Sequence, residues 1–279
     1  MKIAFVTGSA SGLGLEICRA LLLREYHVAM FSRDAAQLEK ESAALNAEGR
    51  IITFPGDVTN LDRVREAVRY VETTWGSIDI AIANAGIRNA TWADDFSVEC
   101  AKQLMETNYF GMLHLFDAVM PRMLKQKRGC FVGIASLAGI RCLPGGSGYG
   151  ASKSAMQAFL DTVRLELKPK GVQVVTVNPW FIRTPAKNDG VSRPLVVEPD
   201  WAANTIIRGI EAGKSQIEFP LLPSLGWKML RLLPNAIFAW LFGLRRGRSS
   251  IGLKLLILAG TRIGTHRANN RMPPSSTKR

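Results

Sequence analysis

Through the first 220 residues of the chain, short apolar runs alternate with longer amphipathic stretches. The short runs are almost continuously hydrophobic, as expected of strands that are buried on both faces of a sheet. The predicted strands are Lys2–Thr7, His27–Ser32, Arg50–Phe54, Ile78–Ala83, Cys130–Ala135, Val172–Asn178 and, in a short seventh run, Gln216–Phe219.

The stretches between these strands repeat apolar residues at helical spacing. They predict helices over about 13–24, 34–48, 60–75, 97–127, 149–168 and 201–212. Pro121 should end or kink the fourth helix, because proline lacks the N–H that an interior helical position uses. A chain that alternates strand and helix in this way is predicted to be an α/β protein with a doubly wound, Rossmann-type parallel sheet of about seven strands.

The composition fits one such domain and limits its chemistry. Apolar residues make up 47% of the 279 and charged residues 21%, which is typical of a globular protein with a full core. No linker-like segment interrupts residues 1–220, so they are predicted to form a single domain. Four cysteines without CxxC spacing and three histidines argue against a metal site and a disulfide framework. We therefore expect a cytoplasmic protein with no signal peptide.

Positive charge is unevenly distributed along the chain. It carries 36 Lys and Arg against 23 Asp and Glu, and residues 221–279 hold eleven of these cations and no acid. The first 220 residues are therefore close to neutral. This asymmetry predicts a surface partner for the C-terminal part.

A glycine-rich turn, residues 7–14 (TGSASGLG), joins the first strand to the first helix. Glycines let the backbone approach a pyrophosphate closely, and a helix N-terminus adds free N–H groups and the positive end of its dipole. The spacing is Gly-x3-Gly-x-Gly and not the commoner GxGxxG, so the position between strand and helix carries the argument. The candidate phosphate-binding residues are Gly8, Ser11, Gly12, Leu13 and Gly14.

Tyr149 and Lys153 are four residues apart on one predicted helix, which puts both side chains on the same face. A free tyrosine has a pKa of about 10, too high to exchange protons well at neutral pH. A neighbouring ammonium favours the tyrosinate, so Lys153 is expected to lower the pKa of Tyr149. By itself, the pair could equally be a surface aromatic–lysine contact.

In order along the chain, the glycine turn, Asn84-Ala85-Gly86, Ser136 and Tyr149-x3-Lys153 resemble the short-chain dehydrogenase/reductase family over about residues 1–220. The resemblance implies an oxidoreductase that moves a hydride between a nicotinamide cofactor and a carbonyl/secondary alcohol pair. It implies that Tyr149 is the general acid/base and that Lys153 also holds the nicotinamide ribose. Ser136 would bind the substrate oxygen, and Asn108 would hold a water that extends the proton relay.

The end of the second strand bears on the choice of cofactor. In the Rossmann design an acid here binds the ribose of NAD, whereas a base accommodates the 2′-phosphate of NADP. The family's NAD-selective acid would fall at Ser32, which is uncharged, and Arg33 follows it. A guanidinium pairs well with phosphate, so NADP(H) is predicted over NAD(H). Asp34 competes, as a helix N-cap or as a ribose ligand, and Arg33 would then be a solvated loop charge.

The other cofactor contacts that the resemblance implies are Asp57 and Val58 along the adenine, Asn84 and Gly86 against the cofactor, and Pro179, Ile182 and Thr184 around the nicotinamide carboxamide. Two positions depart from the family pattern, because Ala83 replaces an asparagine and Trp180 a glycine. A tryptophan lacks the freedom of glycine at positive φ. Trp180 therefore either reshapes this loop or lines an apolar substrate pocket.

Beyond residue 220, the apolar runs 221–244 and 251–259 are interrupted by or border on Lys and Arg. Neither has the roughly 20 uninterrupted apolar residues that a membrane-spanning helix needs. Residues 221–265 are expected to form an apolar-basic helical extension that serves as a lid, a subunit interface or, through residues 221–260, a membrane-surface segment. Residues 266–279 are predicted to be disordered. No nucleic-acid-binding motif is present. The family resemblance implies that the protein is a homodimer or homotetramer.

Two functions fit these features. The first is an NADP(H)-dependent reductase or dehydrogenase for an apolar or lipid-like carbonyl or alcohol, a substrate preference that rests on Trp180 and the apolar extension. The second is a non-catalytic NADP-binding protein that its basic tail anchors to a membrane or partner. The joint presence of Asn108, Ser136, Tyr149 and Lys153 favours the first.

Overall fold

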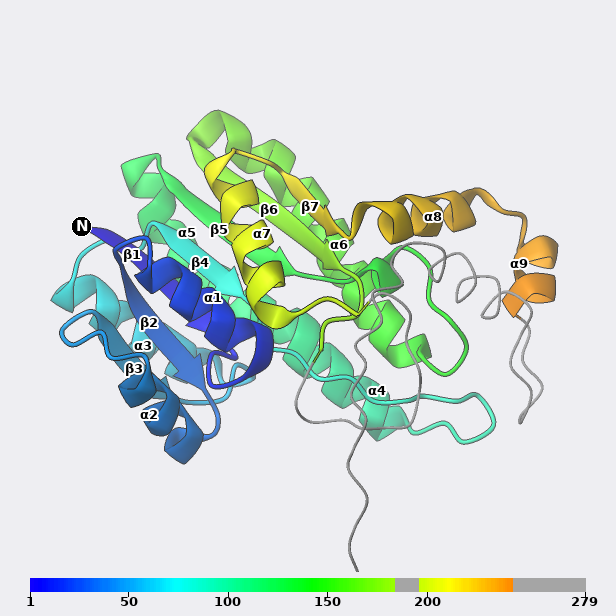
Figure 1. Cartoon of the computed structure of the whole chain (residues 1–279), viewed down its shortest axis with the longest axis horizontal. Coiled ribbons are helices and arrows are strands. Elements are labelled where there is room, and N and C mark those ends of the chain that lie inside the picture. The colour runs from blue at the N-terminus through cyan, green and yellow to red at the C-terminus, as the bar shows by residue number, and fades with distance from the viewer. Residues whose placement is uncertain (184–195, 243–279) are drawn as a thin grey trace, which may run out of the picture.

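A parallel sheet forms the middle layer of the protein, with helices on both faces (Figure 1). The computed structural model describes residues 1–183 and 196–242. The strand order is β3-β2-β1-β4-β5-β6-β7, and every neighbouring pair is parallel. The strands are β1 (Lys2–Thr7), β2 (Tyr26–Ser32), β3 (Ile51–Pro55), β4 (Ile80–Ala83), β5 (Gly129–Ile134), β6 (Val172–Pro179) and β7 (Gln216–Phe219). The order reverses between β1 and β4, where doubly wound sheets open a ligand crevice at their carboxyl ends.

The helices divide between the two faces of the sheet. One face is covered by α1 (Gly12–Leu22), α2 (Ala35–Ala44) and α7 (Pro199–Glu211), and the other by α3 (Leu61–Thr74), α5 (Gly111–Gln126) and α6 (Ser147–Leu167). The short helix α4 (Val98–Leu104) precedes α5, while α8 (Leu221–Leu232) and α9 (Asn235–Phe242) follow β7. The predicted Rossmann-type α/β fold with seven parallel strands is confirmed.

Each central strand contributes to two hydrophobic cores. On β1, Ala4 and Val6 belong to the core that contains α1 and α7, whereas Ile3 and Phe5 belong to the core that contains α3, α5 and α6. Successive side chains of a strand point to opposite faces, so both sets are buried. This explains why the strand segments are continuously hydrophobic in the sequence.

The region predicted as one helix over 97–127 is interrupted earlier than expected. After α4, a π-helical segment, Met105–Phe110, leads into α5. Pro121 lies inside α5 without ending it, so of the two predicted outcomes, an end or a kink, the end is excluded. Pro121 is exposed, and water can satisfy the carbonyl that lacks its usual partner there. A π-helical turn shifts the side-chain register and is frequent at functional sites.

After β7, α8 and α9 extend from one end of the sheet (Figure 1). Within the described residues, the chain after β7 is helical over Leu221–Leu232 and Asn235–Phe242. The rest of the predicted extension, 243–265, and the predicted disordered tail, 266–279, lie outside the described residues. Among the helices that are described, none is both long and apolar enough to cross a bilayer.

Close packing between β5 and α6 determines where the α6 side chains lie. A Cβ placed on Gly133 would stand only 2.4 Å from Cδ1 of Leu160, which is fully buried. The missing side chain lets the helix approach the strand. Lys153, also on α6, reaches the strand end, where its Nζ donates to the carbonyl of Ile134 at 2.7 Å.

Gly133→Ala should therefore move α6 away from β5. We expect the variant to lose about 1–3 kcal/mol of unfolding free energy, because the fully buried side chain of Leu160 must move to admit the added methyl group. Gly226→Ala on α8 is the matched control, since a Cβ there meets no atom within 4 Å. Its stability should stay equal or rise slightly. Urea unfolding of both variants measures this, and equal stabilities would contradict the packing argument.

Candidate active site

The glycine turn after β1 adopts the conformation that its composition predicts. Gly8 and Gly12 have φ of +65° and +54°, a region that L side chains rarely adopt. A Cβ on Gly14 would come within 2.1 Å of the carbonyl oxygen of Gly8. Glycine is therefore required at position 14 for the turn and the helix to pack, and at positions 8 and 12 for the backbone conformation.

Side chains from the end of β4 brace this turn. Nδ2 of Asn84 donates to the carbonyls of Thr7 and Gly8 at 3.0 and 3.1 Å. In return, the hydroxyl of Thr7 accepts from the backbone N–H groups of Asn84 and Ala85, both at 3.1 Å. Asn84 thus holds the glycine turn against the end of β4.

A pocket of about 340 Å³ lies between the glycine turn and the ends of β2, β3 and β4. Its lining comprises Gly8, Ser11, Gly12, Leu13, Gly14, Ser32, Arg33, Gly56, Val58, Asn84, Ala85, Gly86, Ile87 and Thr107. The side chain of Ser11 makes no capping hydrogen bond to α1, and the first turn of α1 contains no acidic residue. The first N–H groups of α1 thus remain available for an anion, and these residues fit the pyrophosphate of a dinucleotide.

At the end of β2, Arg33 is the cation on the pocket wall, and its side chain is 64% exposed. It forms a loose ion pair with Asp57, with 3.6 Å between Nη1 and Oδ2. Asp34 accepts a hydrogen bond from Gln37 N at 2.9 Å and caps α2. The carboxylate of Asp34 is thus engaged as a helix cap, which favours the first of its two predicted roles.

The three residues predicted for proton transfer come together at the end of β5. Ser136 follows the strand, and its side chain hydrogen-bonds the phenol of Tyr149, which is partly buried on the first turn of α6. One turn later, Lys153 is only 4% exposed. Its Nζ lies 5.9 Å from the centroid of the Tyr149 ring. A substrate oxygen could accept from both hydroxyl groups here.

Burial dominates the ionisation of both α6 residues. Desolvation raises the pKa of Tyr149, while the hydrogen bond from Ser136 and the charge of Arg88 act in the opposite direction. Desolvation lowers the pKa of Lys153 to about 7. The net direction for Tyr149 is therefore opposite to the expectation that Lys153 lowers its pKa, because the loss of water outweighs the groups that act to lower it, Ser136 and Arg88.

Asn108 lies in the π-helical segment and is completely buried. Its Oδ1 accepts from Ile87 N at 2.8 Å, and its Nδ2 donates to Ile87 O at 3.0 Å and to Oγ of Ser152 at 2.9 Å. A surface role is thus excluded, and Asn108 joins the segment after β4 to α6. Its predicted water stays a prediction.

Gly86 brings the pocket and the α6 residues together. A Cβ on Gly86 would lie 3.1 Å from Oδ1 of Asn108 and 3.7 Å from Nζ of Lys153. The pocket wall at Gly86 is therefore in close contact with the residues predicted for the proton relay. The backbone of Gly86 therefore lies directly against Asn108 and Lys153, with little room for a side chain between them.

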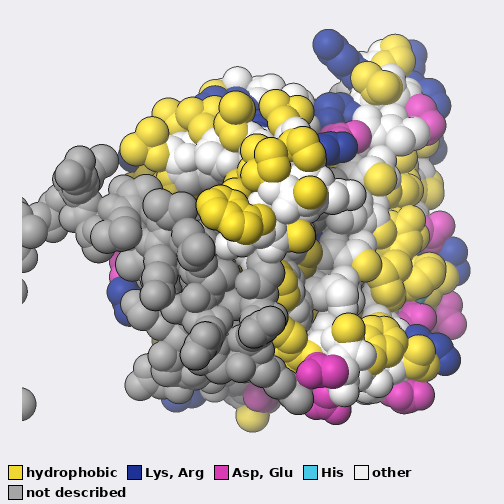
Figure 2. Space-filling view, turned by 90° about the vertical axis from the view of Figure 1, so that its right-hand side faces the viewer, with side chains coloured by type: hydrophobic (Ala, Val, Ile, Leu, Met, Phe, Trp, Pro, Cys, Tyr) yellow, Lys and Arg dark blue, Asp and Glu magenta, His cyan; other side chains and the backbone are white. Residues whose placement is uncertain are grey.

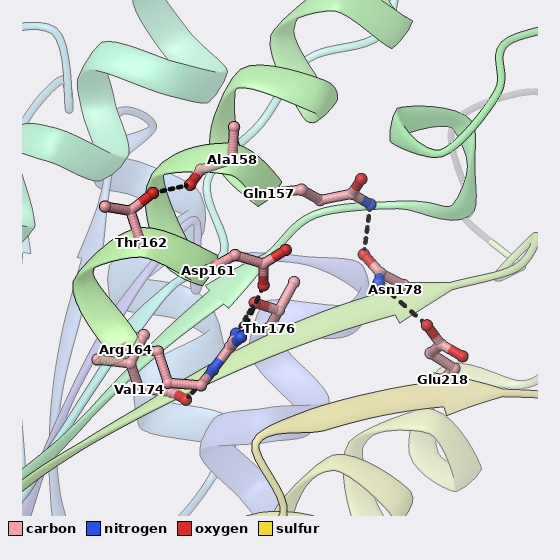
Figure 3. Close-up of polar contacts among 9 residues, drawn as sticks. All are labelled: Gln157, Ala158, Asp161, Thr162, Arg164, Val174, Thr176, Asn178 and Glu218. Carbon is pink, nitrogen blue, oxygen red and sulfur yellow. Dashed lines mark hydrogen bonds and ion pairs between the residues drawn. The ribbon is translucent and has the colours of Figure 1, made fainter. Parts of the chain in front are cut away.

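Sequence reasoning did not identify Gln157, although it follows Lys153 by four residues and shares its helix face. Figure 3 shows Gln157, Asn178 of β6 and Glu218 of β7 pointing toward one another. Nε2 of Gln157 donates to Ser136 O at 2.8 Å and to Oδ1 of Asn178 at 2.7 Å, and Nδ2 of Asn178 donates to Glu218 at 3.3 Å. This chain of hydrogen bonds fixes Ser136 relative to α6 and the last two strands.

The segment after β6 carries an aromatic cluster. Trp180 makes edge contacts with Phe181 and Trp227, with ring centroids 5.0 and 5.2 Å apart. Pro179 ends β6, and Ile182 forms an isolated parallel bridge with Val197. Thr184, the last of the predicted nicotinamide contacts, lies outside the described residues. The tryptophan that replaces a family glycine is thus packed among other aromatic rings.

Comparison with known proteins establishes the family. A family model described as short chain dehydrogenase matches residues 2–193. An uncharacterized oxidoreductase of Myxococcus xanthus is 31% identical over 85% of this chain and 94% of its own length. Dehydrogenase/reductase SDR family member 7B of Xenopus laevis is 30% identical over 85% of this chain and 80% of its own.

Solved structures agree with this result. A short-chain dehydrogenase from Streptomyces avermitilis superimposes with a TM-score of 0.75 at 25% identity, covering 85% of this chain and 94% of its own. An alcohol dehydrogenase from Thermococcus sibiricus, complexed with 5-hydroxy-NADP, superimposes with a TM-score of 0.71 at 25% identity, covering 78% of this chain and 96% of its own. The chain belongs to the short-chain dehydrogenase/reductase family of oxidoreductases.

The buried ammonium makes stability depend on pH. Because the folded pKa of Lys153, about 7, lies below its ordinary value of 10.5, the unfolded chain binds more protons between these values. Stability that Lys153 contributes should rise with pH across this window, by at most about 1.4 kcal/mol per pH unit. In Lys153→Met this term is absent, so wild type should gain stability relative to the variant from pH 7 to pH 9.

Urea unfolding at a series of pH values gives this difference. Lys170→Met, which removes an exposed lysine, is the control and should show a constant difference from wild type. If the difference between wild type and Lys153→Met is also constant with pH, burial does not lower the pKa of Lys153.

Proposed function

We propose that this oxidoreductase interconverts a carbonyl compound and a secondary alcohol with NADP(H), and that Tyr149 is its general acid/base. The observation that carries this proposal is the convergence of Ser136, Tyr149 and Lys153 at the sheet edge beside Gly86, a residue of the pocket that fits a dinucleotide. The roles of these residues follow from their positions.

The bound nicotinamide supplies the hydride for reduction and accepts it in the reverse direction. Ser136 and Tyr149 hold the substrate oxygen through their hydroxyl groups and stabilise the charge that develops on it. Because burial raises the pKa of Tyr149, the phenol is protonated at neutral pH and can donate its proton. Lys153, with a pKa of about 7, returns the proton, and Asn108 holds the relay in place.

The proposal of NADP(H) over NAD(H) rests on Arg33. It is the cation at the pocket wall, and the nearby carboxylate of Asp34 caps α2. Among the cofactor contacts, the phosphates would lie at Gly8, Ser11, Gly12, Leu13 and Gly14, the adenine near Val58 and Asp57, and the nicotinamide near Pro179 and Ile182. The NADP analogue bound to the Thermococcus sibiricus alcohol dehydrogenase is consistent with this choice.

An apolar substrate is proposed from the aromatic cluster around Trp180. Trp227 of α8 packs against this ring and is itself buried, so the inner side of α8 forms part of the wall after β6. Residues 1–220 would thus be the catalytic domain, and the extension from Leu221 would border the substrate side. We also propose a homodimer or homotetramer, as the family implies, in a reducing compartment such as the cytoplasm, since all four cysteines are free.

The alternative, a non-catalytic NADP-binding protein, differs from the proposed enzyme in what removal of the Tyr149 hydroxyl should do. Tyr149→Phe should lower kcat/KM by about 10²–10⁴-fold, because the proton donor is lost while the ring remains. The assay is NADPH oxidation with a panel of probes that includes 2-octanone and benzaldehyde. NADPH affinity should stay within about threefold of wild type.

Tyr70→Phe is the control, because Tyr70 is 54% exposed on α3. It should retain full activity. If Tyr149→Phe turns over substrate as fast as wild type, Tyr149 is not the general acid/base. If wild type binds NADPH but reduces none of the probes, the non-catalytic alternative is supported.

Arg33→Ala should weaken NADPH binding about tenfold or more, since a charge-assisted bond to phosphate is worth about 1.5–3 kcal/mol. NADH binding should change little. Arg65→Ala removes a similar exposed cation, one paired with Asp117, and should leave both affinities unchanged. Fluorescence titration of wild type and both variants with each cofactor gives the six dissociation constants. Wild-type affinity for NADH equal to or above that for NADPH would assign selectivity to Asp34 instead.

A further inference from the structure

Helix α8 has a buried side and an exposed side of different character. On the buried side, Ser224 and Trp227 are 2% and 5% exposed, and Nε1 of Trp227 donates to the carbonyl of Arg141 at 2.9 Å. These contacts attach the helix to the loop that follows Ser136. The other side of α8 faces away from the domain.

That other side is an apolar surface, which we call the outer face. On α8 it consists of Leu221, Leu222, Leu225, Met229 and Leu232, and on α9 of Ile237 and Trp240, with exposed fractions between 45% and 75%. The α8 residues recur at helical spacing and therefore share one side of the helix. Figure 2, which views this end of the molecule, shows hydrophobic side chains gathered at its upper part.

The orientation of the outer face is fixed by Arg141. Its Nη1 donates to the carbonyls of Leu230 and Leu233 at 2.8 and 2.9 Å, and its Nη2 donates to Oδ1 of Asn235. The guanidinium also lies 3.9 Å from the ring centroid of Phe238. Arg141 therefore caps the C-terminus of α8 and holds α9 at the same time. The two helices cannot simply turn their apolar residues inward without losing these bonds.

Contiguous apolar surface of this kind is uncommon on a protein that faces only water, and it marks an interaction site. The surrounding charge indicates which partner fits. On α8, Arg231 is exposed and Lys228 pairs with Glu218, and residues 221–279 contain eleven Lys and Arg without a single acid. A second copy of the same surface would bring like charges together, whereas an anionic lipid surface complements them.

We propose that the outer face of α8 and α9 docks on the surface of an anionic lipid bilayer. Leucine and methionine side chains would enter the boundary between headgroups and acyl chains, and Trp240, 69% exposed, would lie at the interface that tryptophan prefers. Basic residues add electrostatic attraction to anionic lipid. The docking is peripheral, and it does not depend on the proposed cofactor or reaction.

The test uses flotation of the full chain with vesicles of phosphatidylcholine alone or of phosphatidylcholine mixed with phosphatidylglycerol. Wild type should bind the mixed vesicles, more weakly at high salt, and bind poorly to phosphatidylcholine. Leu225→Gln combined with Met229→Gln should reduce the partition coefficient about tenfold or more, because it removes two apolar anchors without changing charge. Both side chains are exposed, so the fold should be retained.

Leu23→Gln combined with Leu165→Gln is the matched control. Leu23, which follows α1, and Leu165, on α6, are 77% and 76% exposed, and their replacement should leave vesicle binding unchanged. If the α8 variant binds as well as wild type, the outer face is not the docking surface, and residues 243–279 or charge alone must hold the protein. If the variant instead changes the oligomeric state in light scattering and not vesicle binding, a second copy covers the face. Either result overturns the proposal.

Tryptophan fluorescence gives a second, independent readout. Acyl-chain brominated lipid in the mixed vesicles should quench wild-type emission, and this quenching should fall in Trp240→Phe. Trp75→Phe removes a tryptophan at the opposite end of α3 from the site and should leave the quenching unchanged. Equal quenching in wild type and Trp240→Phe would show that α9 does not reach the bilayer.

Discussion

The buried ammonium of Lys153 is the constraint on which the site depends. Its described partners are the carbonyl of Ile134 and the sulfur of Met156, neither of which carries a charge. A cation without a charged partner is costly to bury, so the pKa of Lys153 falls, and the value depends on how rigidly the fold excludes water around it. The close approach of α6 to Gly133 and the bonds from Gln157 to Ser136 and Asn178 supply that rigidity. Packing of one helix on one strand therefore sets the ionisation of the candidate site.

A second consequence follows at the switch between β1 and β4. Asn84 and Thr7 lock the glycine turn to the end of β4, and two residues later Gly86 touches Asn108 and Lys153. The candidate phosphate-binding residues and the candidate proton-transfer residues are thus joined through a short stretch of backbone. The π-helical segment contributes by turning Asn108 inward, where it holds Ile87 and Ser152. The π-helical segment therefore helps to fix the position of the chain after β4 relative to α6.

Much of this arrangement could be predicted from the sequence, because the strands are buried on both faces and the motif residues lie at strand ends. Gly8 and Ser136 fit that pattern, whereas Tyr149, on the first turn of α6, follows from its spacing to Lys153 and from the family resemblance. The pKa directions of Tyr149 and Lys153 could not be predicted, since they depend on how much water the fold excludes. The π-helical segment and Gln157 were also missed, because neither changes the hydrophobic periodicity. The helix continues past Pro121 because this residue is exposed to water, and the exposure of a single position cannot be predicted from one sequence.

The extension after β7 is joined to the site by contacts that its composition alone could not reveal. Arg141, in the loop after Ser136, caps α8 with its side chain and accepts from Trp227 with its carbonyl. Trp227 in turn packs on Trp180, and Lys228 pairs with Glu218 at the end of the bond chain from Gln157. The inner and outer sides of α8 are therefore parts of one rigid connection. A bilayer docked through the outer face, as proposed, would therefore keep a fixed orientation to Ser136 and Tyr149.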